Sequence, residues 1–311
     1  MDSDNVLVSI ICDVYNHEPY LRDCLEGFIN QKANFTYEIL IHDDASTDNS
    51  VNIIKEYVNK YPHLFKPIFQ TENQYSKGMS IWYDVQIPRA KGKYIAICEG
   101  DDYWIDPYKL QKQVNILEND ETLMACATNT ITVSNTGEVL SKYKENIVKD
   151  NKEGRHNLRD FMQTTHQYPT ASVLYRRKEE NKIKEYCRIT SNPYFGDWNL
   201  WIALHIIGDF YYLDEVTTAY RINPTSVTHS NVGKRRLALA KANFEIIKNV
   251  QSILPEEYDD IRKELDKTAW IWFNLANAYK HSRKYFHMIW CLLRCELKEP
   301  GYAWKKIVCK R

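Results

Sequence analysis

Short apolar runs that alternate with amphipathic stretches dominate the first 120 residues of this 311-residue chain. Residues 6–12 (VLVSIIC), 37–42 (YEILIH) and 93–98 (KYIAIC) have the length and β-branched content of buried strands. Residues 20–31 and 108–119 carry apolar side chains at helical spacing. Such alternation predicts an α/β fold, with a mostly parallel sheet flanked by helices.

The same reasoning predicts further helices and strands up to about residue 230. They are helices at 51–61, 81–90 and 197–207, strands at 65–70, 123–133, 171–177 and 209–222, and a loop or hairpin at 134–156. Beyond residue 231 the pattern is wholly helical. We therefore predict a main domain over residues 1–230 and an all-helical C-terminal extension over 231–311.

The helical extension contains Trp272-x-x-Leu275-Ala276-x-x-Tyr279, which resembles one tetratricopeptide hairpin. A single copy cannot form a solenoid, because several repeats are needed to bury a continuous core. A helical hairpin packed against the main domain and a unit that binds another protein both remain open.

Charge and cysteine content narrow the class of protein. Lys plus Arg and Asp plus Glu both number 41, which argues against nucleic-acid binding. Residues 283–311, however, hold eight Lys or Arg against two Glu, together with Trp290, Tyr302 and Trp304. This segment is either a solvated basic helix or a peripheral contact with an anionic membrane surface.

Several features predict a cytoplasmic protein, either soluble or attached to the inner face of the cell membrane. The eight cysteines have no regular spacing, which fits a reducing compartment better than a disulfide framework. The first residues, MDSDNVLVSII, carry no basic leader, and no apolar run reaches the ~18–20 residues of a spanning helix.

Acidic residues follow two of the predicted strands directly. Asp43 and Asp44 open DDASTDNS, and Glu99, Asp101 and Asp102 lie in CEGDDYW. The carboxyl ends of parallel strands meet at one edge of a sheet, where α/β proteins bind ligands. Three neighbouring carboxylates repel one another and lose hydration, and a bound cation offsets that cost. A turn that caps the next helix is the alternative interpretation of CEGDDYW.

These acidic residues belong to a set of four sequence blocks that occur in a fixed order. They are VSIICDVYNHEPYL (8–21), YEILIHDDASTDNS (37–50), AKGKYIAICEGDDYWIDPYKLQKQ (90–113) and FGDWNLW (195–201). In this order they resemble glycosyltransferase family 2, nucleotide-sugar-dependent enzymes with the GT-A fold. The resemblance implies a nucleotide-sugar part over residues 1–120 and an acceptor part over 121–230.

The resemblance also implies roles for the acidic residues. Asp44 would accept a hydrogen bond from the nucleobase, with Asp43 supporting the turn. Asp102 would be the direct ligand of Mn²⁺ or Mg²⁺, and Asp101 would contact the ribose or a metal-bound water. Glu99 stands where the family usually has an aspartate, so which of the three carboxylates touches the metal stays open.

Four further positions belong to the predicted site. Asp197, in FGDW, matches the catalytic base, although it also suits a plain N-cap of the following helix. Trp198 would limit the access of water to it. Asp13 departs from the small or apolar residue usual there, and would either contact the nucleobase or face solvent. Trp104 would form a wall under a sugar or pack in the core.

Basic residues complete the predicted site. Arg221 and His229 are candidates for contacts with the diphosphate or the metal, and Lys77 and Arg89 are candidates for contacts with the diphosphate. Structural or solvated roles are the alternatives for each. No glycine-rich phosphate loop or dinucleotide fingerprint occurs in the sequence.

The predicted function is therefore an inverting, metal-dependent glycosyltransferase that takes a nucleotide diphospho-sugar, with a UDP-sugar favoured. The acceptor would be a glycan or lipid-linked acceptor of bacterial-type surface polysaccharide synthesis. A non-catalytic nucleotide-sugar binder or scaffold that acts through the helical tail is the alternative.

Overall fold

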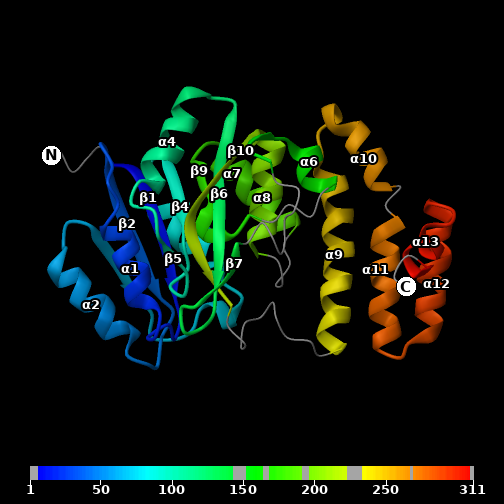
Figure 1. Ribbon diagram of the computed structural model, residues 1–311, viewed down its shortest axis with the longest axis horizontal. Coiled ribbons are helices and arrows are strands. Elements are labelled where there is room, and N and C mark those ends of the chain that lie inside the picture. Colours follow the sequence, from blue (N-terminus) through cyan, green and yellow to red (C-terminus); the bar gives the residue numbers. More distant parts are fainter. Residues whose placement is uncertain are drawn as a thin grey trace. The chain divides into compact units, whose positions relative to one another are not determined.

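The computed structural model describes residues 6–142, 152–163, 168–190, 196–222, 233–266 and 269–308 (Figure 1). The chain forms two compact units. The first comprises Met1–Glu180 and Ile207–Ile222, and the second comprises Asn181–Ile206 and Asn223–Arg311. The division after residue 230 that the sequence indicates stays a prediction.

A parallel group of strands forms one half of the sheet in the first unit. Its order is β3-β2-β1-β4, with β1 at Val6–Val14, β2 at Thr36–Asp43, β3 at Phe65–Phe69 and β4 at Tyr94–Ile97. All three pairings are parallel. The crossovers between them supply helices for the sheet faces, as the strand–helix alternation predicts.

The other half of the sheet is mixed. After β4 come β9 (Leu174–Arg176), β6 (Leu123–Val133), β10 (Asp209–Arg221) and β5 (Tyr103–Trp104). β9 is antiparallel to both of its neighbours, whereas β10 runs parallel to β6 and antiparallel to β5. Two short strands lie off this path, β7 (Val139–Lys142) on β6 and β8 (Gly154–His156) on β10.

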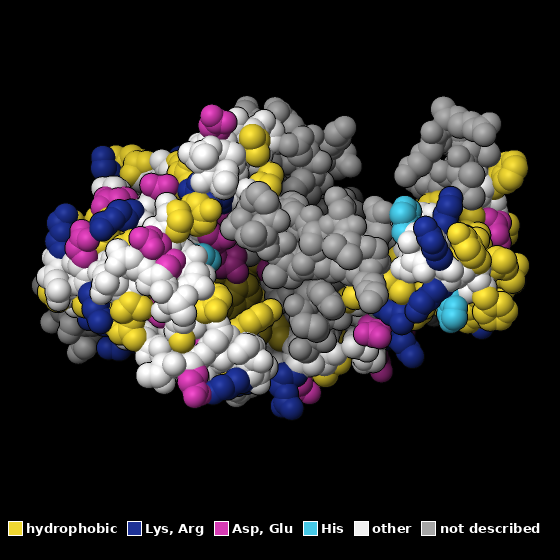
Figure 2. All heavy atoms as spheres, turned by 90° about the horizontal axis from the view of Figure 1, so that it is seen from below, with side chains coloured by type: hydrophobic (Ala, Val, Ile, Leu, Met, Phe, Trp, Pro, Cys, Tyr) yellow, Lys and Arg dark blue, Asp and Glu magenta, His cyan; other side chains and the backbone are white. Residues whose placement is uncertain are grey.

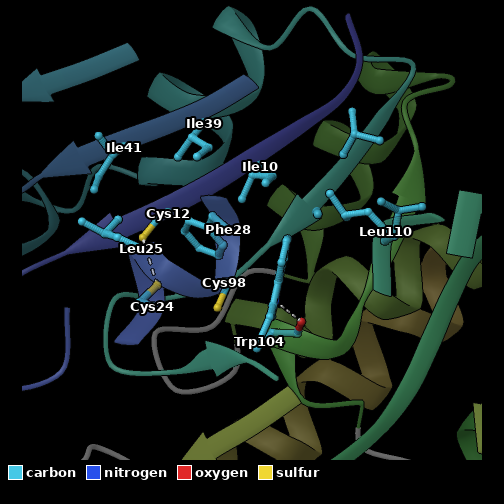
Figure 3. Packing of buried hydrophobic residues seen from close by; sticks show 14 of the residues in the cluster. Ile10, Cys12, Cys24, Leu25, Phe28, Ile39, Ile41, Cys98, Trp104 and Leu110 are labelled. Carbon is cyan, nitrogen blue, oxygen red and sulfur yellow. Dashed lines mark hydrogen bonds between the residues drawn. The ribbon is translucent and has the colours of Figure 1, made fainter. Parts of the chain in front are cut away.

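The helices of the first unit pack against both halves of the sheet. Their bounds are α1 Leu21–Ile29, α2 Ser50–Lys60, α3 Ile87–Arg89, α4 Lys109–Asn119 and α6 Leu158–Gln163, with 3-10 turns η1 Tyr75–Lys77 and η3 Thr170–Ser172. Ile10 and Cys12 of β1 pack against Leu25 and Phe28 of α1 (Figure 3). The intervening Ile11 is also buried, so both faces of the sheet are covered, as an α/β fold requires.

Two predicted elements differ in detail from the structure. The helix expected at 81–90 is a π-helix, η2 at Ile81–Gln86, followed by the single turn of α3. Pro88 has no N–H to donate to the carbonyl of residue 84, which favours a break in the α-helical pattern there. The strand expected at 171–177 is shorter, because η3 occupies its first residues.

The second unit is helical wherever it is described. It contains α7 Glu180–Ile189, α8 Gly196–Ile207, α9 Gly233–Ile253, η4 Glu256–Tyr258, α10 Asp259–Asp266, α11 Ala269–His281, α12 Tyr285–Lys298 and α13 Tyr302–Val308. Leu237 of α9, Leu275 and Ala276 of α11 and Cys291 of α12 share one small core. The predicted all-helical extension is thus confirmed. Within the described ranges, no helix is both long and apolar enough to cross a membrane.

Candidate functional site

The predicted acidic segments lie at one edge of the sheet, at the carboxyl ends of β1, β2 and β4. The N–H of Asp44 donates to the carbonyl of Val14 over 2.9 Å, and the N–H of Gly100 donates to the carbonyl of Asp13 over 3.0 Å. The segment after β2 and the segment after β4 therefore flank the end of β1. This is the edge at which parallel sheets bind ligands.

Arg221, the last residue of β10, anchors the acidic loop that follows β4. Its backbone N–H donates to Asp102 Oδ1 over 2.8 Å, and its Nε donates to the Asp101 carbonyl over 2.9 Å. Its guanidinium also donates to Asp23 Oδ2 and to the Ser134 carbonyl, each over 3.2 Å. The side chain is only 2% exposed. These hydrogen bonds hold the buried Arg221 side chain against the acidic loop. The structure gives no direct support to the predicted contact between Arg221 and a diphosphate.

Asp102 is a buried carboxyl, 2% exposed, in an unfavourable electrostatic setting. Burial raises its pKa well above the ordinary value, and the charges of Asp101 and Glu99 raise it further. The hydrogen bond from Arg221 opposes this shift only in part. No described residue donates a hydrogen bond to Asp102 Oδ2. An ionised Asp102 therefore gains most from a cation placed at this oxygen.

The donor set fits a divalent metal whose remaining ligands come from a bound nucleotide. Hard cations such as Mg²⁺ and Mn²⁺ take oxygen ligands and are often held by one or two carboxylates plus phosphates. Within the described part of the chain, no group of three or more His, Cys, Asp or Glu side chains is arranged to hold a metal alone. That Asp102, with Asp101 or Glu99, forms the protein's part of such a site stays a prediction.

The turn after β2 is fixed by its own aspartates. Asp43 Oδ2 accepts the N–H of Ser46 over 3.0 Å, as expected of a residue that supports the turn. Asp44 accepts the backbone N–H groups of Gln74 over 2.7 Å and Tyr75 over 3.0 Å, one on each carboxylate oxygen. These two hydrogen bonds connect Asp44 to the backbone of residues 74 and 75. The contact between Asp44 and a nucleobase stays a prediction.

Two of the four described non-glycine residues with a left-handed backbone lie at the same strand ends. Asn16, after β1, has a φ of 57°, and Ala45, after β2, has a φ of 64°. The side chain of Asn16 accepts the N–H of Thr47 over 2.8 Å, while Ser46 Oγ accepts the N–H of Asn16 over 2.9 Å. These bonds lock the two loops together, and left-handed conformations outside glycine are frequent at ligand sites.

Asp13 lies near the end of β1, with 22% of its side chain exposed. Its Oδ1 accepts a 3.0 Å hydrogen bond from Gln86 Nε2, which also donates to the carbonyls of Cys12 and Leu40. Burial raises the pKa of Asp13 to about 7, and the charge of Asp44 adds to the shift. Asp13 therefore changes its charge near neutral pH, which neither predicted role anticipated.

Asp197 and Trp198 lie in the first turn of α8, in the second compact unit. Asp197 Oδ1 accepts the N–H of Trp198 over 2.8 Å. Burial raises the pKa of Asp197 above its ordinary value. An acid with a raised pKa in a helical first turn is compatible with a general base, and that role stays a prediction.

The structure gives the remaining predicted residues different surroundings. Trp104 packs in the core, where its Nε1 donates to the Ala171 carbonyl over 2.9 Å and its ring contacts Phe28 edge-on at 4.8 Å (Figure 3). It therefore takes the core role rather than that of a sugar wall. Lys77 forms an ion pair with Glu72, and Arg89 donates to the carbonyl of Lys66. His229 lies outside the described residues.

Gln86 is the residue of this site that sequence reasoning missed. It is fully buried, and its amide joins the ends of β1 and β2. The available signal was Gln-Ile-Pro inside an otherwise helical pattern, because a proline there implies a disturbed helix.

A cavity of about 730 Å³ opens beside the acidic loop. Its walls come from α1, the residues just after it, and the segment around β5, and they include Asp23, Glu26, Asn30, Tyr103 and Ile105. Because Tyr103 follows Asp102 directly, this cavity and the acidic loop share one segment of chain.

Comparisons with known proteins agree with this geometry. The model of the Glycosyl transferase family 2 matches residues 9–182. An uncharacterized protein of Mycobacterium tuberculosis is 34% identical over 230 residues, which are 74% of this chain and 62% of the relative. The chain thus spans less than two thirds of that relative's length. An uncharacterized glycosyltransferase of Methanocaldococcus jannaschii is 26% identical over 76% of this chain and 78% of its own length.

Solved structures show the same fold at low identity. S. aureus TarS 1-349 in complex with UDP-GlcNAc has a TM-score of 0.56 at 13% identity, covering 98% of this chain and 92% of that one. The mannosyltransferase PcManGT from Pyrobaculum calidifontis, in complex with GDP-Man and Mn²⁺, has a TM-score of 0.55 at 14% identity, covering 99% and 86%. The predicted GT-A fold is confirmed, and the chain belongs to glycosyltransferase family 2.

Proposed function

We propose that this glycosyltransferase is inverting and metal-dependent, and that it transfers a hexosyl or N-acetylhexosaminyl group from a nucleotide diphospho-sugar. The observation that carries the proposal is Asp102, a buried carboxyl at the shared strand edge whose Oδ1 is held by the Arg221 N–H. Burying an acid beside two others costs free energy that a bound cation offsets.

Asp102 would hold Mn²⁺ or Mg²⁺, with Asp101 or Glu99 as the second carboxylate. A divalent cation bound there neutralises the charge that grows on the diphosphate leaving group. Arg221 keeps Asp102 Oδ1 engaged, so that Oδ2 is the oxygen left to bind. The predicted contact between Asp101 and the ribose is compatible with its place one residue before this ligand.

The nucleobase would bind between the ends of β1 and β2. Asp13 presents a carboxyl there, and Asp43 and Asp44 set the shape of the adjoining turn. The similar structures support a nucleotide-sugar donor, because TarS is in complex with UDP or UDP-GlcNAc and PcManGT with GDP-Man. We favour a UDP-sugar.

Asp197 would act as the base that accepts the proton of the acceptor hydroxyl. Inversion requires such a group opposite the leaving group. The raised pKa of Asp197 makes its carboxylate a stronger proton acceptor than an ordinary aspartate. Trp198, next to it in the first turn of α8, would limit access of water.

The acceptor would be a glycan or lipid-linked glycan of bacterial-type surface polysaccharide synthesis, and the protein would work in the cytoplasm, peripheral to the inner face of the cell membrane. Family membership and the basic aromatic end of the chain support this assignment.

Thermal unfolding with UDP, GDP, ADP, CMP and TDP, each with Mn²⁺ or with EDTA, tests the donor site. A nucleotide at ~100 times its Kd adds about 2.7 kcal/mol of stability, or about 4 °C in Tm for a chain of this length. We expect one nucleotide to raise Tm with Mn²⁺ and to lose most of that effect in EDTA.

The Asp102→Asn variant should lose the same effect, because Asn keeps an acceptor for Arg221 but removes the charge that binds a cation. Glu121→Gln, at an exposed position, is the matched control and should respond like the natural protein. An unchanged Mn²⁺-dependent shift in Asp102→Asn would refute the metal assignment.

A further inference from the structure

Helix α12 carries apolar side chains on two opposite faces. Cys291 and Cys295 are fully buried on one face, within the small cores shared with α11. On the other face Phe286, Leu293 and Leu297 are 82%, 61% and 78% exposed. One face of α12 therefore completes the helical core, and the other presents large apolar side chains to the surroundings.

The exposed apolar residues form a continuous stripe. At about 100° per residue, Phe286, Ile289, Leu293 and Leu297 fall within an arc of roughly 100°, centred opposite the buried cysteines. We call these four residues the apolar stripe of α12. A stripe of this width along a whole helix face is typical of a second binding surface.

Exposed cations outnumber exposed acids in and around α12. The exposed Lys and Arg residues of this region are Arg283, Lys284, Arg294, Lys298 and Lys305. The acids are fewer: Glu299 is exposed, and Glu296 accepts the N–H groups of Gly301 and Ala303. In Figure 2 the C-terminal helices accordingly show hydrophobic side chains with Lys and Arg side chains among them.

Two exposed tryptophans lie in the same helical region. Trp304 of α13 is 71% exposed, and Trp290 of α12 is 45% exposed. The ring of Trp290 packs edge-on against Trp272 at 5.3 Å, and the Arg294 guanidinium lies over it at 5.1 Å. An indole fixed beside an apolar stripe and under a cation has the amphipathic character of residues at a lipid–water boundary.

We propose that the apolar stripe of α12, with Trp304, binds an anionic lipid bilayer and lies in the plane of its surface. The Lys and Arg residues would face the anionic headgroups, and the stripe would enter the acyl boundary. An anionic bilayer suits this surface because one helix face supplies large apolar side chains, while the positive charges are distributed over several Lys and Arg residues. This proposal rests on the proposed function in one respect only: membrane binding would bring the donor site to a lipid-linked acceptor.

Vesicle flotation of the full chain, without nucleotide or metal, tests the surface. The vesicles contain phosphatidylcholine alone or with roughly 30% phosphatidylglycerol. We expect binding only to the anionic vesicles, and weaker binding at high salt, because salt screens the headgroup attraction. Leu293→Ser with Leu297→Ser should lower the bound fraction at least about tenfold, since both side chains lose their burial in lipid.

Val139→Ser with Leu140→Ser is the matched control, because these residues are 65% and 53% exposed on β7 of the other unit. It should bind as the natural protein does. Circular dichroism and Tm confirm that both double variants are folded. Equal binding by the α12 variant, or no binding of the natural protein to anionic vesicles, overturns the proposal.

Three further outcomes distinguish this proposal from a dimer interface and from the proposed donor site. A concentration-dependent dimer that dissociates in the α12 variant, with no vesicle binding, would assign the stripe to a second copy of the chain. Retained Mn²⁺-dependent nucleotide stabilisation without vesicle binding would overturn this proposal alone. Loss of nucleotide stabilisation with vesicle binding intact would instead overturn the proposed donor site.

Discussion

Replacing Asp13 by asparagine should stabilise the ligand-free protein at neutral and basic pH. The carboxyl lies at the end of β1, where burial raises its pKa from 3.8 to about 7 and the charge of Asp44 adds to the shift. Hydrogen bonds from Gln86 and Trp82 offset part of the cost. Asparagine keeps an oxygen that accepts the 3.0 Å bond from Gln86 and removes the charge.

The size of the effect follows from the pKa shift. A change from 3.8 to about 7 corresponds to about 4 kcal/mol at 1.36 kcal/mol per unit. Because 22% of the side chain is exposed, solvent screening reduces this value, and we expect about 1–3 kcal/mol. The pKa of the folded state is the higher one, so folding favours the protonated acid. The stabilisation by Asp13 is fully present below about pH 4 and is lost as the pH rises through about 7.

Urea unfolding of both proteins between about pH 4 and pH 8 measures this difference. The advantage of Asp13→Asn should be close to zero at the acid end, grow with pH and level off near pH 8. Glu121→Gln is an exposed control that should follow the natural protein throughout. An advantage independent of pH, or a variant less stable at pH 8, would refute the account of Asp13 as a desolvated acid.

Two further predictions concern packing and catalysis. Gly27→Ala should destabilise the fold by about 1–3 kcal/mol in urea unfolding, because its Cβ would come within 2.8 Å of the Trp104 carbonyl oxygen and 2.9 Å of the Trp104 nitrogen. Unchanged stability would mean that α1 shifts freely. Asp197→Asn should keep the Mn²⁺-dependent nucleotide shift but lower sugar transfer at least about 100-fold, measured as donor consumed with acceptor present; near-normal transfer would remove Asp197 as the base.

The parallel half of the fold could be predicted from the sequence because local patterns determine it. The apolar runs that end near Cys12, His42 and Cys98 become β1, β2 and β4, and their parallel pairing follows from the helices between them. Because parallel strands end at the same edge of a sheet, the acidic segments that follow β2 and β4 are expected to lie at one edge. The antiparallel insertion of β9 between β4 and β6 could not be predicted in this way, because it depends on pairing between distant segments.

The candidate site was predictable in its residue types but not in the partners of each side chain. CEGDDYW and HDDAS identified the carboxylates, yet only the structure shows that Asp44 binds the backbone of residues 74 and 75. Arg221 and Trp104 have charges and surfaces suited to a ligand, and the fold instead uses them to hold the acidic loop and to fill the core. The propensity and spacing of residues do not predict which partners a side chain contacts in the folded protein.

The anchoring of the acidic loop by Arg221 has a consequence for the order of folding. The hydrogen bond from Arg221 to Asp102 joins residues 119 positions apart, whereas β1, β2, β3 and β4 pair within the first 97 residues. Contacts between distant residues form later, because the closure of a long loop must precede them. We therefore expect the parallel half to assemble before β10 docks, so that pulse-labelled hydrogen exchange protects the Asp44 amide earlier than the Arg221 amide. Nascent chains would then acquire the acidic loop in its final shape only after β10 has been synthesised.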